Sequence, residues 1–123
     1  MISDKELFTK SVHPLIRVTK NYVLINEVAC NLLNIAIYDE IKIIRSIENE
    51  LYIAVVTNTE HEGGCILRDQ HSENLLTYSK FVKDELTILD NYRISELPIF
   101  DKKMCLDLFK LTKYEPNKQQ HVN

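Results

Sequence analysis

Glycine is scarce in this chain, with two residues in 123, and proline is nearly as rare, with three. Flexible linkers are rich in glycine, serine or proline, so this composition excludes domains joined by long linkers of that kind. Tryptophan is absent, and no apolar run approaches the roughly 20 residues that a membrane-spanning helix needs. Hydrophobic residues make up 45% and charged residues 27%, which is typical of a globular protein, so we expect one compact domain over residues 1–123.

An excess of positive charge is also missing, because the formal net charge is -3. Proteins that bind polyanions are usually basic, so the bulk charge gives no support to nucleic-acid binding, although it leaves room for a local basic patch. Cys30, Cys65 and Cys105 form an odd set without Cys-x-x-Cys spacing, so we expect reduced thiols. The first ten residues are polar and acidic and do not resemble a secretory signal. These features predict a cytoplasmic protein that contacts no membrane.

Local patterns predict eight strands and two short helices. The strands are expected at 15–19, 22–25, 41–45, 51–56, 66–68, 75–78, 92–97 and 104–111. The helices are expected at 27–34 and 80–86, begun by the N-cap residues Asn26 and Ser79. Residues 57–65 hold both glycines and almost no apolar side chains, so we predict a loop there, and we predict a connection at 98–103.

The two halves of the chain share one spacing of apolar and capping residues. When the first half is shifted by 53 positions, residues 22–56 align with 75–109 without a gap, and Asn26 falls on Ser79. An internal repeat is one interpretation, and chance alignment of two similar β-β-α-β-β segments is the alternative. Segments of about 45 residues bury too little surface to fold alone, which favours two repeats around one shared core.

The repeat interpretation predicts a β-rich α+β fold, in which two pseudo-symmetric β-β-α-β-β repeats form one small swapped-hairpin-like barrel. Repeat one covers residues 15–56 and repeat two covers 66–111, with the loop 57–65 between them and a polar tail over 112–123. Nine apolar side chains from both repeats are predicted to be buried: Val28, Leu33, Ile35, Ile41, Ile53, Phe81, Leu86, Ile94 and Leu106.

The segment "RVTKNYVLINEVACNLLNIAIYDEIKIIRSIENELYIAVV" resembles the AbrB/SpoVT swapped-hairpin module. That family has two strands ending near a proline, a helix ending in Leu-Gly-Ile, a Gly-Asp pair and two further strands. Here Asn26 stands at the proline position, Asn34 at the first glycine and Tyr38 at the second. Two family modules interleave into one barrel, so the resemblance implies two tandem divergent copies in this chain. A non-glycine residue at positive φ costs about 1–2 kcal/mol, so Tyr38 is expected to disfavour the turn that glycine permits.

The resemblance implies a non-enzymatic binding module, because AbrB-type regulators bind DNA. It points to the first hairpin of each repeat as the contact surface, and the basic residues there are Arg17, Lys20, Arg68 and Lys80. Ordinary solvated charge is the alternative for these four side chains. The helix carries Glu27 and Cys30 on a segment that is basic in DNA-binding members. The alternative function is therefore a structural or protein-interaction protein that keeps the fold and binds a protein partner or itself.

His61, Cys65 and His71 are the best candidates for metal ligands. Their His-x3-Cys-x5-His spacing is not a recognised zinc pattern, and a fourth ligand is missing, so a solvated loop is the preferred interpretation. The adjacent carboxylates Asp39 and Glu40 point to opposite faces if they lie on a strand, so they cannot act as a pair. No catalytic residue, metal or cofactor is predicted.

Overall fold

A computed structural model describes residues 8–19, 21–56, 64–70, 74–78 and 91–114. In this part of the chain, antiparallel strands form one sheet in the order β5-β3-β4-β10-β8-β1-β2-β7-β6, and β9 pairs with β10 off this path. The elements have the following bounds: β1 Leu15–Val18, β2 Tyr22–Ile25, α2 Glu27–Leu33, β3 Glu40–Arg45, β4 Leu51–Val56, β5 Gly64–Cys65, β6 Leu67–Arg68, β7 Leu75–Tyr78, β8 Asn91–Ile94, β9 Ile99–Asp101 and β10 Leu106–Lys113.

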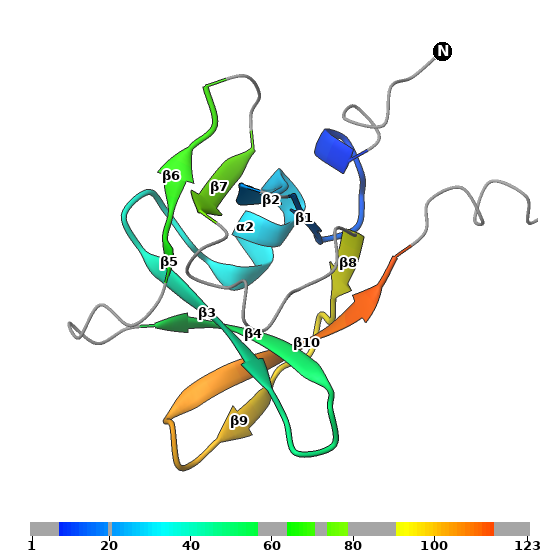
Figure 1. Cartoon of the computed structure of the whole chain (residues 1–123), viewed down its shortest axis with the longest axis vertical. Coiled ribbons are helices and arrows are strands. Elements are labelled where there is room, and N and C mark those ends of the chain that lie inside the picture. The colour runs from blue at the N-terminus through cyan, green and yellow to red at the C-terminus, as the bar shows by residue number, and fades with distance from the viewer. Residues whose placement is uncertain (1–7, 20, 57–63, 71–73, 79–90, 115–123) are drawn as a thin grey trace, which may run out of the picture.

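The sheet curls into a nearly closed antiparallel barrel of nine strands (Figure 1). β5 and β6 are separated by Ile66 alone, yet they stand at opposite ends of the strand order, where β5 pairs with β3 and β6 pairs with β7. The backbone of Ile66 links this connection to the turn before β3. Its N–H donates to the Asp39 carbonyl at 2.7 Å, and its carbonyl accepts from the Tyr38 N–H at 2.7 Å.

The barrel wall is apolar on both sides near β1 and β2. Alternate residues such as Ile16 and Ile25 lie in the main core cluster. Leu15 and Leu24 lie on the opposite face and are buried by Phe8, which is helical and forms a second, smaller cluster with them. Because both faces of these strands are covered, the sequences of β1 and β2 show only weak alternation of polar and apolar residues.

Asn26 begins α2 as the sequence predicts, and its side chain is fully buried. Its Oδ1 accepts from the N–H groups of Ala29 at 2.9 Å and Leu15 at 3.1 Å. Its Nδ2 donates to the carbonyls of Phe8 at 3.1 Å and His13 at 2.9 Å. One amide therefore uses two donors and two acceptor sites to connect the helix, β1 and the segment before β1.

Several predicted element bounds agree with the structure and others need correction. The strands 22–25, 51–56 and 75–78 are confirmed, and α2 covers the predicted helix within one residue. The predicted strand 92–97 ends at Ile94, the predicted connection 98–103 contains β9, and the last strand lies two residues later than predicted. Gly64–Cys65, predicted as loop, forms β5, because it adds to the free edge of β3. The predicted helix 80–86 lies outside the described residues, together with Ser79, Phe81 and Leu86.

The predicted core is largely confirmed, since Leu33, Ile35, Ile41, Ile53 and Ile94 are all buried. Val28 and Leu106 are half-buried, so their predicted burial is wrong. The short helix turns Ala29 and Leu33 toward the core and leaves Val28 beside the exposed Glu27. Leu106 pairs with Asp101 of β9, on a hairpin that extends past the barrel strands, so fewer neighbours cover it.

Candidate nucleic-acid interface

The two hairpins predicted to contact DNA lie side by side in one surface (Figure 1). β2 and β7 pair from Tyr22↔Tyr78 to Ile25↔Leu75, which joins the hairpins in the order β1-β2-β7-β6. Arg17 lies on β1 and Arg68 on β6, so three strand spacings of about 4.8 Å separate their strands. Lys20 and Lys80, the other two predicted contact residues, lie outside the described residues.

Arg17 is half-buried rather than freely exposed. Its Nε donates to Asn91 Oδ1 at 2.8 Å, and its guanidinium carbon lies 5.1 Å from the centre of the Phe8 ring. A cation over an aromatic face is electrostatically favourable. These contacts orient the guanidinium along the outer wall of the barrel, so Arg17 also has a structural role that a purely solvated charge would lack.

Arg68 is exposed at the end of the two-residue strand β6. Among the described residues, none accepts a hydrogen bond from its side chain or forms an ion pair with it. Across the four strands, Arg17 pairs with Leu24, Leu24 with Leu76 and Leu76 with Leu67, so these four residues share one face of the sheet. Because neighbours on a strand point to opposite faces, strand alternation alone would direct Arg68 to the face opposite Arg17. Arg68 nevertheless lines a pocket together with Leu67 and Leu76, at the end of β6.

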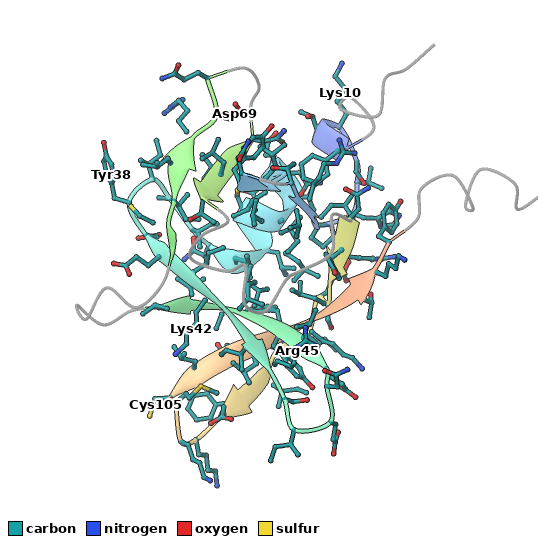
Figure 2. The ribbon with its side chains drawn as sticks, in the orientation of Figure 1. Lys10, Tyr38, Lys42, Arg45, Asp69 and Cys105 are labelled. Carbon is teal, nitrogen blue, oxygen red and sulfur yellow. The ribbon has the colours of Figure 1, made fainter. Side chains whose placement is uncertain are left out.

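This pocket has a volume of about 550 Å³. Its apolar lining comes from the outer face of three adjacent strands, with Tyr22 on β2, Leu76 on β7 and Leu67 on β6. Its polar lining includes Arg68, and Tyr38 lies on the turn before β3. Figure 2 shows Tyr38 and Asp69, a further lining residue, at the end of the molecule that holds β6 and β7. The pocket therefore opens on the surface that the two hairpins share.

Tyr38 has φ = 76°, so the turn adopts positive φ despite the cost expected for a tyrosine at this position. Asn34, at the other glycine position of the resemblance, also has positive φ, at 55°. Hydrogen bonds hold the Tyr38 turn: Asp39 Oδ2 accepts from the Ala36 N–H at 2.8 Å, and the Tyr38 N–H donates to Ile66. The tertiary contact overrides a local cost of about 1–2 kcal/mol. In the sequence, the feature that points to Tyr38 is a tyrosine at a position where glycine would adopt positive φ with the least steric cost.

A different surface of the barrel carries charges that neutralise one another. Glu50 accepts a hydrogen bond from the Tyr52 hydroxyl at 2.9 Å and lies 3.2 Å from Lys110 Nζ. The Tyr52 hydrogen bond, followed by Lys110, lowers the pKa of the Glu50 carboxyl, and the hydrogen bond to Glu50 raises the pKa of Tyr52. The positive charge of Lys110 is therefore balanced by the Glu50 carboxylate and adds little to a basic face.

The structure describes the three cysteines but not the two predicted histidine ligands. Cys30 is half-buried, and burial raises the pKa of its thiol to about 11, so it is protonated at neutral pH. Cys30, Cys65 and Cys105 are free thiols, as predicted. His61 and His71 lie outside the described residues, and the described part of the chain holds no cluster of three potential metal ligands. That part also has no helix with the length and hydrophobicity required to cross a membrane.

Comparisons of the chain with known protein families, curated proteins and solved structures find no match in any of the three. The class that the strands define is a small, mostly β protein with a nearly closed antiparallel barrel. The resemblance to AbrB/SpoVT modules consequently rests on the residues of the first half alone.

Proposed function

We propose that this protein is a non-enzymatic binding module that contacts DNA through the surface β1-β2-β7-β6. Arg17 and Arg68 are the described contact residues, and Lys20 and Lys80 are the other two. The β2–β7 pairing carries the proposal, because it joins both hairpins in one surface with an arginine on each outer strand. Arginine contacts to phosphate oxygens would position the duplex or strand on this surface.

The proposal includes an origin of the fold in two swapped-hairpin repeats. The two-repeat hypothesis makes β1 equivalent to β5–β6, β2 to β7, β3 to β8 and β4 to β10. When each strand of the nearly closed barrel is replaced by its equivalent, every strand keeps the same pair of neighbouring strands, which supports two repeats. The β2–β7 register gives independent support. Val23 pairs with Thr77 and Leu24 with Leu76. A shift of 53 positions turns each of these two pairs into the other, as a pseudo-two-fold axis between the strands requires. A helix at 80–86, as the sequence predicts, would complete the second repeat.

Fluorescence anisotropy with labelled DNA at low and physiological salt tests the DNA proposal. Few cations supply the affinity, so binding to random DNA should be weak and should fall steeply as salt rises. The double variant Arg17→Ala/Arg68→Ala should lose binding. Lys102→Ala/Lys103→Ala is the matched control, because it removes two exposed charges from the β9–β10 turn, at the far end of the molecule from β6 and β7 (Figure 1).

The contacts of Arg17 with Asn91 and Phe8 require a check on folding, because their loss would also affect stability. Circular dichroism melts of both double variants separate lost binding from lost structure. The DNA proposal fails if the wild-type protein binds neither random DNA nor DNA from near its own gene at low salt.

Self-association is the second candidate function, and the exposed apolar strand β9 favours it. Ile99 and Phe100 are more than half exposed, at 59% and 58%, and β9 pairs with β10 alone among the described strands. Exposed apolar edge strands can pair with another chain. Light scattering of the wild type and Phe100→Ser tests this, and a wild-type monomer at high concentration would exclude it.

A further inference from the structure

We infer that the pocket beside Arg68 binds one unpaired nucleotide, with the base against Tyr38 and the phosphate at Arg68. This inference rests on the proposed function and narrows it, because it makes single-stranded DNA the preferred ligand of this surface.

The pocket has the size and the lining of a site for a small ligand. Its volume of about 550 Å³ falls within the range of roughly 300–1,000 Å³ that is usual for such sites. Ile37, Leu67 and Leu76 are the aliphatic residues of the lining, and Arg68, Asp69 and Gln70 are its polar residues. A base inside a duplex cannot enter a depression of this kind, whereas an unpaired base can.

Arg68 supplies the positive charge that a phosphate requires. Its guanidinium has five N–H donors, and no described residue accepts a hydrogen bond from it. Asp69 also lines the pocket and is largely buried, with 8% of its surface exposed. The Asp69 carboxylate repels any phosphate, and it repels a polyphosphate more strongly than a unit with one phosphate, such as a nucleotide within a strand.

The strained backbone of Tyr38 indicates that its ring serves a purpose other than core packing. The side chain is 76% exposed, so burial does not offset the cost of φ = 76°. A glycine would form the same turn more easily. Strain of this kind, held by the surrounding hydrogen bonds, is characteristic of binding sites. An exposed aromatic ring beside an arginine provides both surfaces that a single nucleotide contacts, because bases stack on aromatic rings without strict sequence preference.

Gln70 adds a polar group to the lining, and its exposed amide can donate to and accept from the edge of a base. The site thus offers stacking, one cation and one amide. That set suits a nucleotide better than a purely apolar ligand, which would leave Arg68 and Gln70 unused.

Anisotropy titrations with a labelled mixed-sequence single strand and with its duplex test the inference. The single strand should bind more tightly than the duplex. Tyr38→Ala should weaken single-strand binding roughly 5- to 150-fold, as loss of one stacking ring does. Tyr38→Phe keeps the ring and should bind like the wild type. Arg68→Gln should weaken binding, whereas Lys103→Gln, which removes the same charge from the β9–β10 turn, should leave it unchanged.

The outcomes separate this inference from the proposed function. If the duplex binds at least as tightly as the single strand and Tyr38→Ala binds both normally, the inference fails while the DNA proposal stands. If neither DNA binds at low salt, the DNA proposal fails. An NMR titration with a nucleoside monophosphate then decides the pocket alone: shifts confined to the amides of Tyr38, Leu67 and Gln70 support a nucleotide site, and their absence overturns it.

Discussion

The buried side chain of Asn26 accepts a hydrogen bond from the backbone N–H of Leu15, 11 residues earlier in the chain, at 3.1 Å. The same oxygen caps α2 through the Ala29 N–H, so one atom sets the position of the helix relative to β1. The amide nitrogen ties down the segment before β1 through the carbonyls of Phe8 and His13. Local capping and long-range packing thus depend on a single residue.

Asn26→Ala should lower the free energy of unfolding by about 3 kcal/mol or more. The substitution removes the helix cap, worth about 1 kcal/mol, and leaves two N–H groups and two carbonyls in a buried site without their partner. Urea denaturation followed by circular dichroism measures the loss. Asn31→Ala, an exposed position on the same helix, is the control and should change stability by less than about 0.5 kcal/mol. Equal losses in the two variants would contradict the structural role of Asn26.

The strain at Tyr38 can be measured separately from binding. Tyr38→Ala and Tyr38→Gly both remove the ring, but only glycine adopts φ = 76° without a steric cost. Tyr38→Gly should therefore be more stable than Tyr38→Ala by about 1 kcal/mol in denaturant melts, while both lose nucleotide binding equally. Stability that is higher in the alanine variant would mean that the turn relaxes to negative φ once the ring is absent.

Thr77 should be replaceable by valine with a gain in stability. Its side chain on β7 is fully buried, and its hydroxyl oxygen has no hydrogen-bond partner among the residues that the structure describes. Valine has nearly the same shape and carries no polar group, so Thr77→Val should raise the free energy of unfolding by about 1 kcal/mol. Thr112→Val, at an exposed position of β10, is the comparison and should be nearly neutral. A loss of stability in Thr77→Val would show that the hydroxyl is satisfied in solution.

The Glu50 carboxyl should titrate below its ordinary value of 4.5. The Tyr52 hydroxyl donates to the charged form and Lys110 attracts it, so both lower the folded-state pKa relative to the unfolded chain. The resulting stabilisation is complete above the unfolded pKa and is lost as the pH falls through the lower folded pKa. Carboxyl-carbon NMR measures the midpoint. Tyr52→Phe removes the larger cause and should move the midpoint back toward 4.5, and an unchanged midpoint would contradict that cause.

Local sequence determined the elements whose signals lie within a few residues. The strands 22–25 and 51–56 follow from continuous β-branched and aromatic residues, and α2 follows from a capping asparagine and a short apolar face. The hypothesis that Arg17 and Arg68 belong to equivalent hairpins rests on spacing. The structure places them on the outer strands of one surface, while the repeat and the contact with DNA stay predictions.

Tertiary structure decided what depends on partners distant in the sequence. Gly64–Cys65 forms a strand because β3 offers it an edge, and Val28 is half-exposed because a seven-residue helix turns only its other side to the core. Tyr38 adopts positive φ because Ile66 and Asp39 hold the turn, although its own side chain opposes that conformation. The pocket beside Arg68 exists only where three strands and two turns meet. Sequence patterns report the preferences of neighbouring residues, which span about 1 kcal/mol for strands, whereas strand pairing and long-range hydrogen bonds can outweigh those preferences and so fix the final arrangement.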